Sequence, residues 1–478
     1  MAFPLNRTKI VCTIGPASNS PETLKQMILA GMNVARLNFS HGEFSGHKEV
    51  IDNIRSAADA TGRRVAIMAD LPGPKMRIGQ LKPDPIELKP GELFTLTSEK
   101  IIGDAERVSI SFAKLPQLLK PGDKLFLNDG FIQLKVVRIE NSDVLCKVIV
   151  GGKLGSRKGL NLPGIDLGIC AFTDRDRQCL KFAIENGVHA VSQSFVETAA
   201  DIDAVREAAR ELGKNLFIIA KIERYGALDH MDEILEATDG IMIARGDLGV
   251  EVPIEQMALI QKNLMEKANL KGKPVITATQ MLESMTEHRL PTRAEATDVA
   301  NAIVDGTDCV MLSGESATGK FPVEAVAMLA KIAASIEPHR PICSIEKTLQ
   351  KYGRKCSFTP QELIALGVET TLRHITPAAI VVPTHSGKTA RDIARFRHPV
   401  WITAVSSQEK TCQNLLFSYG VFPVHKAEHP EDWKPFIKEW LISQGVDGDF
   451  VVLTEGPSTS HPEVNNRLEI LDLRQISG

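Results

Sequence analysis

A repeated unit, in which a glycine is followed by a short apolar run, constrains the fold of this chain more than any other feature. Eight such runs, rich in Val, Ile and Met, lie in the first two-thirds of the chain. The first is KIVCTIGP at residues 9–16, and the others, each after a glycine or an Asp-Gly pair, are MNVARLN, RVAIMAD, VHAVSQSF, LFIIAKIE, IMIARGD, PVITATQ and CVMLSGE. Continuous apolar runs are typical of parallel strands covered on both faces. A glycine at a helix end supplies the left-handed cap that returns the chain to the sheet.

The segments between these runs predict amphipathic helices. One has Ser20 as its N-cap and Pro21 at its first helical position, and two others begin at Thr173 and Thr198. Eight strand-then-helix units predict an α/β fold of the (β/α)8 type, a TIM barrel. On periodicity alone, an open doubly wound sheet remains the alternative.

The helical pattern is interrupted after MADLPGPK and resumes at FTDRDRQ. The interval contains alternating runs separated by Pro-Gly, Asp-Gly and Gly-Gly turns, which predict a small all-β module of hairpins. The module leaves the barrel where a strand meets its following loop. Active sites of barrels lie on that face, so we expect a lid.

We therefore expect three folding units. Residues 1–70 and 171–341 would form the barrel, residues 71–170 the inserted β-barrel-like lid domain, and residues 342–478 a C-terminal α/β domain. The stretch EPHRPICS leads into this last unit, which contains the predicted helices TPQELIALGVETTLRHI and TARDIARFR and the strands AAIVVP, VWITAVS, VFPVH and FVVLTEG.

Composition excludes several classes of protein. The 478 residues carry 56 Lys and Arg against 59 Asp and Glu, a net charge of −3, which argues against nucleic-acid binding or a polybasic membrane patch. No run of about 18 apolar residues exists, and the first residues lack the apolar region of a signal peptide. The eight cysteines include no C-x-x-C pair, so a zinc site is not expected. We expect a cytoplasmic protein with free thiols.

Polar residues at the carboxyl ends of barrel strands are the candidates for an active site. They are Arg36, Asn38, Ser40 and His41 after the second run, Asp70, Lys75 and Arg77 after the third, Lys221, Glu223 and Arg224 after the fifth, Arg245, Gly246 and Asp247 after the sixth, Thr277 and Thr279 after the seventh, and Ser313 and Glu315 after the eighth.

Glu223 and Asp247 follow neighbouring strands at the same level, and two hard carboxylates without His or Cys suit Mg²⁺ or Mn²⁺. Salt bridges to Lys221 and Arg245 are the alternative. Lys221 leaves its strand on the same face as Glu223, where it could stabilise charge on a transferred phosphoryl group or an enolate oxygen.

Three further groups could bind anions. Arg36 and Arg77 offer planar forks for phosphate. The segment ARGDLGVEVPIEQM predicts a turn that opens onto a helix, whose free amides at Gly246 and Asp247 could hold a carboxylate. The turn PTHSGKTA resembles the end of a Walker A loop, but the first glycine of that motif would fall at Val382. It could bind phosphate through Lys388 and backbone amides, or be an ordinary capped turn.

Together these stretches resemble one family closely, the pyruvate kinases. The matching motifs cover nearly all of residues 7–330 in order, and they are TKIVCTIGPAS, MNVARLNFSHG, DLPGPKMR, KGLNLPG, AKIER, ARGDLGVE, ATQMLESM, PTRAEATDVANAI and DGTDCVMLSGESATGKFPVEAV. The resemblance implies phosphoryl transfer from phosphoenolpyruvate to ADP, which gives pyruvate and ATP in the final step of glycolysis.

The resemblance also implies residue roles. Arg36 would hold the transferring phosphoryl group and Lys221 would stabilise it, while Glu223 and Asp247 bind the divalent ion. Gly246, Asp247 and Thr279 would form the substrate site, and Ser313 would belong to the proton-delivery network. Nucleotide binding would fall to Asn38, His41, Arg77 and, from the lid, Lys158.

One departure from the family concerns potassium. Potassium-dependent members carry Thr-Lys-Gly-Pro-Glu after the aspartate of the third strand, whereas here Leu71, Pro72, Gly73, Pro74 and Lys75 follow Asp70. Lys75 stands where the glutamate would be, and its charge could replace K⁺. The positions that resemble the K⁺ ligands are Asn38, Ser40, Asp70 and the Leu71 carbonyl. We expect an enzyme that does not require K⁺.

Family precedent implies a homotetramer that is activated allosterically by a phosphorylated sugar or AMP. The effector would bind at Thr384, Ser386, Lys388 and Thr389. Two other functions stay open on the sequence: another Mg²⁺-dependent barrel enzyme with an enolate intermediate, and a non-catalytic relative that senses metabolites.

Overall fold

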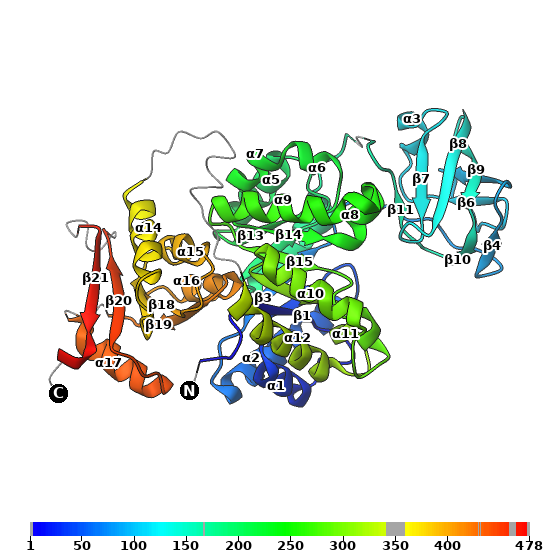
Figure 1. Ribbon diagram of the computed structural model, residues 1–478. Helices are drawn as coiled ribbons and strands as arrows, with labels where there is room; N and C mark the ends of the chain where they lie inside the picture. The colour runs from blue at the N-terminus through cyan, green and yellow to red at the C-terminus, as the bar shows by residue number, and fades with distance from the viewer. Residues whose placement is uncertain are drawn as a thin grey trace.

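The computed structural model describes residues 3–165, 168–340, 359–428, 430, 432–457 and 465–475. A central barrel carries a strand-rich insert on one side and an α/β domain on the other (Figure 1). The expected domain boundary at residues 341 and 342 and two cysteines, Cys343 and Cys356, lie outside the described residues. Within the described ranges, every helix is too short or too polar to cross a bilayer.

The eight apolar runs form one closed parallel barrel, which confirms the prediction and excludes the open sheet. The order around the barrel is β1-β16-β15-β14-β13-β12-β3-β2. The strands are β1 (Lys9–Thr13), β2 (Met32–Asn38), β3 (Ala66–Leu71), β12 (Ala190–Gln193), β13 (Phe217–Ile222), β14 (Gly240–Ala244), β15 (Val275–Ala278) and β16 (Cys309–Leu312).

Helices surround the barrel, and the three whose starts were predicted begin directly after Ser20, Thr173 and Thr198. Ser20 accepts a hydrogen bond from the amide of Thr23, with Pro21 at the first helical position. The helices are α1 (Pro21–Ala30), α2 (Phe44–Thr61), α4 (Asp174–Glu185), α5 (Ala199–Glu211), α6 (Gly226–Asp229), α7 (Met231–Ala237), α8 (Arg245–Glu251), α9 (Met257–Leu270), α10 (Arg293–Asp305), α11 (Gly314–Ala317) and α12 (Pro322–Ile336). Short 3₁₀ turns add residues 254–256, 283–286 and 337–339.

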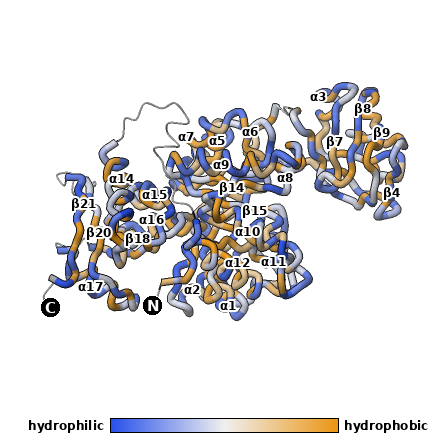
Figure 2. Tube along the Cα trace, viewed as in Figure 1, coloured by the Kyte–Doolittle hydropathy of each residue, from blue (hydrophilic) through white to orange (hydrophobic). Residues whose placement is uncertain are grey.

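Two apolar clusters stabilise the barrel. Alternate strand residues such as Ile10 pack against the surrounding helices, while their neighbours such as Val11 belong to a separate cluster within the barrel. Figure 2 shows hydrophobic stretches in the barrel, in the insert and in the C-terminal domain. Phe417 of the C-terminal domain joins this inner cluster and stacks on Phe217, with ring centroids 5.3 Å apart. The C-terminal domain therefore closes the amino end of the barrel.

The insert is mostly antiparallel and has its own apolar core, which includes Phe94, Leu96 and Leu134. Its larger sheet has the order β11-β7-β8-β9-β5-β6, and β10 pairs with β4. Its elements are β4 (Ile86–Leu88), β5 (Leu93–Thr97), β6 (Arg107–Ser109), α3 (Leu115–Leu118), β7 (Lys124–Leu127), β8 (Ile132–Glu140), β9 (Asp143–Val150), β10 (Gly152–Leu154) and β11 (Leu160–Asn161). The predicted all-β module is confirmed.

The C-terminal domain contains the four predicted strands and one that the sequence did not reveal. That fifth strand, Arg467–Asp472, runs antiparallel at the edge of the sheet, and its apolar residues are interspersed with charged ones rather than forming a continuous run. The sheet order is β19-β18-β17-β20-β21. The elements are α14 (Pro360–Leu372), β17 (Ala379–Pro383), α15 (Lys388–Ala394), β18 (Ile402–Ser406), α16 (Glu409–Asn414), β19 (Val421–His425), α17 (Trp433–Gln444), β20 (Phe450–Glu455) and β21 (Arg467–Asp472), with 3₁₀ turns at residues 415–417 and 473–475.

A buried ion pair joins this domain to the barrel. Arg397 donates from Nη2 to Asp308 Oδ2 at 2.6 Å and to the Gly306 carbonyl at 2.9 Å. Asp308 also accepts the amide of Tyr419 at 2.9 Å. Removing either partner of this buried pair would leave an unpaired buried charge and would therefore be strongly destabilising.

His189 makes the stability of the barrel depend on pH. Its Nδ1 accepts the amide of Ile67 on β3 at 2.8 Å, so the ring is a neutral acceptor, and burial lowers its pKa to about 4, with the positive charge of Arg55 adding to this. Between the ordinary pKa of 6.5 and 4, the unfolded chain binds a proton that the folded chain does not. Stability should therefore fall as the pH drops through this window, by up to about 3 kcal/mol from this residue.

The expected measurement is urea unfolding between pH 6.5 and 4.5, followed by circular dichroism. His189→Gln keeps a neutral acceptor that does not titrate, so its stability should lose less than the wild type over this range. His288→Gln, which changes an exposed ring, is the control. If His189→Gln and the wild type lose the same free energy on acidification, the assignment is wrong.

Candidate active site

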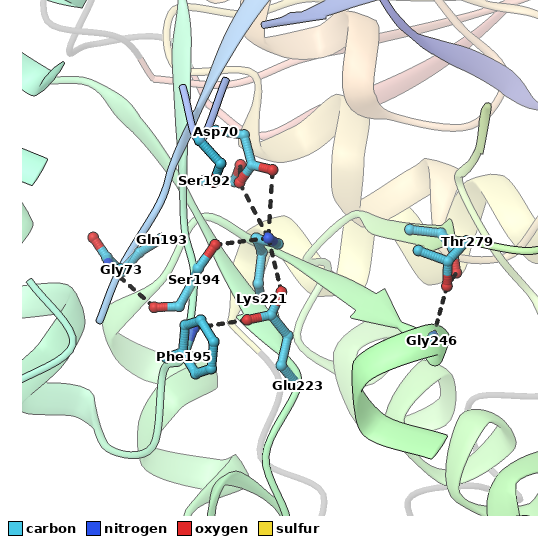
Figure 3. A network of polar contacts seen from close by, with 12 residues as sticks. Asp70, Gly73, Ser192, Gln193, Ser194, Phe195, Lys221, Glu223, Gly246 and Thr279 are labelled. Atoms are coloured by element: carbon cyan, nitrogen blue, oxygen red, sulfur yellow. Dashed lines mark hydrogen bonds and ion pairs between the residues drawn. The ribbon is translucent and has the colours of Figure 1, made fainter. Parts of the chain in front are cut away.

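Four of the predicted strand-end residues, Arg36, Asp70, Lys221 and Glu223, form one cluster at the carboxyl end of the barrel, and Figure 3 shows Asp70 and Glu223 beside Lys221. Arg36 lies near the end of β2 and Asp70 near the end of β3, and Lys221 and Glu223 come from β13 and the residue just beyond it. All four side chains are buried, and Lys221 is only 8% exposed. Charged groups this well buried need partners, and the partners here are one another.

Asp70 lies between two cations. Its carboxylate accepts from Arg36 Nε at 3.0 Å and from the Ser192 hydroxyl at 2.8 Å, and it lies 3.3 Å from Lys221 Nζ. Burial opposes its ionisation, but the charges of Arg36 and Lys221 outweigh burial and lower the pKa of Asp70 below its ordinary value. Asp70 is therefore a carboxylate at neutral pH.

Lys221 stays charged although it is buried. Its Nζ lies 2.7 Å from Glu223 Oε1 and donates to Ser194 Oγ at 2.7 Å. Burial alone would lower the pKa of Lys221, but the carboxylates of Asp70 and Glu223 raise it above the ordinary value. The salt bridge considered as an alternative for Lys221 is thus present, and it fixes the ammonium group at the barrel mouth.

Glu223 and Asp247 form an electrostatically unfavourable pair. Burial raises the pKa of Glu223, Lys221 opposes this effect, and the negative charge of Asp247 adds to it. The alternative pairing of Asp247 with Arg245 is not formed, because Arg245 reaches Asp298 at 2.7 Å and the Thr279 carbonyl at 2.8 Å. Within the described residues, no three His, Cys, Asp or Glu side chains are arranged around one metal position. A cation here would need further oxygen ligands besides these two carboxylates.

Gly246 and Thr279 already contact each other. The Gly246 amide donates to Thr279 Oγ1 at 2.7 Å, and that hydroxyl donates to the Ala278 carbonyl at 2.6 Å. Two expectations are therefore corrected: the Gly246 amide is not free, and α8 begins directly at Arg245 without a preceding turn. Thr279 has φ +67°, a left-handed conformation that is strained for a β-branched residue and is typical of functional sites.

Comparison with known proteins fits this geometry. Residues 5–326 match the model of the pyruvate kinase barrel domain, and residues 362–471 match that of the pyruvate kinase alpha/beta domain. The chain belongs to the pyruvate kinase family. The pyruvate kinase of Thermococcus litoralis is 46% identical over 99% of this chain and 100% of its own length, and that of Geobacillus stearothermophilus is 42% identical over 97% and 80%. A crystal structure of a pyruvate kinase from Cryptosporidium parvum superimposes with a TM-score of 0.90 at 34% identity, covering 98% of this chain and 96% of that one.

The charged cluster is also contacted by residues that were not among the predicted candidates, namely Thr13, Ser192, Ser194 and Phe195. Ser194 accepts from Lys221, and the Phe195 amide donates to Glu223 Oε2 at 2.8 Å. Phe195 has φ +60°, which is strained for a bulky side chain. The polar letters Ser192, Gln193 and Ser194 at the end of the fourth run could have drawn attention to this strand. Nothing in the sequence marks the conformation of Phe195.

Cationic candidates from the loop after β3 gather near His41. Partial burial lowers the pKa of His41, and the positive charges of Arg77, Lys75 and Arg36 add to the effect. Arg77 donates from Nη1 to the Arg157 carbonyl of the insert at 3.2 Å. The structure thus brings these residues to one side of the barrel mouth.

The remaining candidates for nucleotide and K⁺ binding lie in local turns. Asn38 Oδ1 accepts the amide of Ser40 at 3.1 Å. Leu71 is the last residue of β3, directly after Asp70. Lys158 lies on the insert just before β11, exposed, with its carbonyl accepting from the Ile78 amide at 2.9 Å.

Ser313 lies at the end of β16, half-buried, and its amide donates to Glu315 Oε2 at 2.7 Å. Glu315 is wholly buried and also accepts the amide of Leu282 at 3.1 Å. Ser313 is therefore held at the barrel rim by its backbone, which leaves the orientation of its hydroxyl open.

The predicted effector residues form a separate turn in the C-terminal domain, after β17. The Gly387 amide donates to Thr384 Oγ1 at 3.0 Å, and the Lys388 amide to Ser386 Oγ at 3.4 Å. Thr389 is the second residue of α15. Lys388 Nζ pairs with the buried Asp392 at 2.6 Å. Arg391, which sequence reasoning missed, donates to the Ser386 carbonyl at 3.2 Å.

Asp70→Asn should be strongly destabilising, because it leaves Arg36 and Lys221 buried beside each other without their shared carboxylate. We expect a loss of about 3–5 kcal/mol in the free energy of unfolding. Asp52→Asn, in an exposed pair 3.4 Å from Lys48, should cost at most about 1 kcal/mol. Urea unfolding of both variants at pH 7 measures the difference, and similar losses would contradict the central role of Asp70.

Proposed function

We propose that this chain transfers the phosphoryl group of phosphoenolpyruvate to ADP and protonates the resulting enolate to pyruvate, with the residues at the carboxyl end of the barrel. The observation that supports this most directly is the buried Lys221 ammonium, held charged beside Glu223 and near Asp247. A loose phosphoryl-transfer transition state needs positioning and positive charge more than covalent catalysis.

The two carboxylates fit a divalent cation. Glu223 and Asp247 are hard oxygen donors, and the unfavourable effect of Asp247 on Glu223 is one that a cation between them would remove. Mg²⁺ or Mn²⁺ bound there would supply charge neutralisation to the phosphoryl oxygens. Substrate oxygens and water would complete its ligands.

Arg36 and Lys221 act on the transferring group in this proposal. Arg36 is oriented from two sides, by Asp70 at Nε and by the Thr13 hydroxyl, which accepts from Nη1 at 2.8 Å. Fixing the guanidinium plane in advance lowers the ordering cost of binding phosphate. Lys221, anchored by Ser194 and Glu223, supplies a positive charge where negative charge develops.

The substrate carboxylate would bind at Gly246 and Thr279, next to Asp247. Since the Gly246 amide donates to the Thr279 hydroxyl, this bond must be exchanged or shared when a carboxylate binds. Ser313, at the rim of β16, would belong to the network that delivers the proton. Arg77, His41 and Asn38 would meet the nucleotide phosphates, together with Lys158 from the insert acting as a lid.

The decisive assay measures pyruvate formed from phosphoenolpyruvate and ADP with Mg²⁺. We expect Lys221→Met to lower kcat by about 10²–10³ while phosphoenolpyruvate still binds, because the lost charge acts mainly in the transition state. Lys48→Met, an exposed lysine on α2, is the control. A wild-type chain that forms no pyruvate would favour the non-catalytic relative, and turnover of phosphoenolpyruvate without ADP would favour another enolate enzyme.

Potassium independence follows from Lys75 in this proposal. Lys75 lies in the loop after β3, and its charge is among those that lower the pKa of His41, so it already contributes positive charge at the barrel mouth. The positions that resemble K⁺ ligands, namely Asn38, Ser40, Asp70 and Leu71, are then not required to hold an ion.

Replacing K⁺ by tetramethylammonium tests this idea. Wild-type activity should change by less than about tenfold, which corresponds to 1.4 kcal/mol, whereas Lys75→Glu should create a K⁺ requirement larger than that. Lys82→Glu, an exposed lysine of the insert, is the matched charge reversal and should leave the cation dependence unchanged. A tenfold loss in the wild type would refute the proposal.

We extend the proposal to regulation, assembly and location. The turn with Thr384, Ser386, Lys388 and Thr389 would bind a phosphorylated sugar or AMP that activates the enzyme. In that case phosphate must compete with Asp392 for Lys388, because the two are paired. A homotetramer and a cytoplasmic location follow from family precedent.

A further inference from the structure

The chain crosses between the barrel and the insert twice, and a buried helix-capping carboxylate holds each crossing. The outgoing crossing leaves β3 through Gly73, and the returning crossing reaches α4 through Ala171. The two carboxylates are Asp176 and Asp201, each at the third position of a barrel helix. Each uses one oxygen for its own helix and the other for a crossing.

Asp176 holds the outgoing crossing. One carboxylate oxygen, Oδ2, accepts the Thr173 amide at 2.8 Å and completes the capping box of α4. The other, Oδ1, accepts the amide of Gly73 at 2.9 Å, from a residue 103 positions earlier in the chain. Asp176 is completely buried, so water does not compete for these bonds.

Asp201 holds the returning crossing in the same way. Its Oδ2 accepts the amides of Glu197 and Thr198 at 2.9 and 3.0 Å, at the start of α5. Its Oδ1 accepts the amide of the buried Ala171 at 2.9 Å. By contrast, the capping box of α14 in the C-terminal domain, at Thr359 and Glu362, makes no contact with either crossing: Glu362 accepts from Thr359 at 2.9 Å and lies 3.8 Å from Arg395.

The outgoing crossing also lies against the charged cluster. Gly73 has φ +64°, and a Cβ at this position would lie 3.0 Å from Phe195 Cδ2 and 3.1 Å from the Ser194 carbonyl oxygen. Ser194 and Phe195 are the residues that contact Lys221 and Glu223. Two residues beyond Gly73 the loop carries Lys75. Gly73 therefore lies between the charged cluster around Lys221 and the part of the loop that carries the cations of the proposed nucleotide site.

The geometry points to Asp176 and Asp201 as positioning residues that fix how the insert leaves and re-enters the barrel, so that Lys75, Arg77 and Lys158 are aligned for the phosphates of ADP. This inference rests on the proposed function and deepens it. Each carboxylate accepts a backbone amide of one crossing at 2.9 Å, so together they restrain the hinge, that is, the two segments at Gly73 and Ala171. The loss of either one frees one crossing without removing a group that contacts substrate.

Asp176→Asn and Asp201→Asn test the inference, because an amide nitrogen cannot accept and one set of bonds must be lost. Hydrogen exchange of peptides that contain Gly73 or Ala171 gives a readout independent of catalysis. Exchange should accelerate about tenfold or more at Gly73 in Asp176→Asn and at Ala171 in Asp201→Asn. Kinetically, the KM for ADP should rise about fivefold, while the affinity for phosphoenolpyruvate with Mg²⁺ changes less than about twofold.

Two control variants distinguish the positioning of the two crossings from the capping of the helices. Thr173→Ala weakens the cap of α4 but leaves the bond from Gly73 to Asp176, and Glu362→Gln alters a capping box elsewhere. Both should keep the wild-type KM for ADP. Equal changes for ADP and phosphoenolpyruvate, or the same split in Thr173→Ala, would show a merely structural role.

The inference can still be tested if one of the variants does not fold. If Asp176→Asn does not fold, Asp201→Asn tests the returning crossing alone, and the wild type itself must protect the Gly73 and Ala171 amides from exchange far better than the exposed Gly164 amide. Unprotected amides would overturn the inference. If the exchange results hold but the wild type forms no pyruvate, the proposed function fails and the hinge assignment stands.

Discussion

The Asp70 carboxylate is the interaction on which the rest of the site depends. It neutralises two buried cations that come from different strands, Arg36 on β2 and Lys221 on β13. Without it, desolvation and mutual repulsion would disfavour both positive charges at the barrel mouth. The pairing of Asn38 with Asp70 and of Asp70 with Ser192 in the β2, β3 and β12 ladders places this carboxylate at the level of its partners. The strand pairing that closes the barrel therefore also brings these charges together.

The barrel was predictable because its signals are local and repeated. A glycine at a helix end and a continuous apolar run each have a direct physical cause, and eight repetitions leave few other folds. The rule that active sites lie at strand ends then located Arg36, Asp70, Lys221 and Glu223 together. The edge strand Arg467–Asp472 was missed because its apolar residues are interspersed with charged ones, unlike the continuous apolar runs of the parallel strands.

Sequence reasoning failed where the backbone supplies the contact. The amide of Phe195 orients Glu223 only because φ is +60°, and a phenylalanine gives no hint of that conformation. Likewise, the sequence lists Gly246 as a donor but cannot show that the Thr279 hydroxyl is its acceptor. Arg245 looked like a partner for Asp247, but the fold directs it to Asp298. The sequence shows which hydrogen-bond donors and acceptors are available, whereas the fold determines which of them pair.

The strained residue Phe195 and its neighbour Ser194 connect the charged cluster to the outgoing crossing at Gly73. Ser194 and Phe195 contact Lys221 and Glu223 on one side and pack against Gly73 on the other. A strained backbone persists only where its surroundings over-determine it, and here the surroundings include the outgoing crossing to the insert. If the insert moves as the proposed lid does, that movement about Gly73 would therefore affect the alignment of Lys221. Because packed interiors are bistable rather than continuously deformable, closure of the insert and alignment of the charges should occur as one two-state transition.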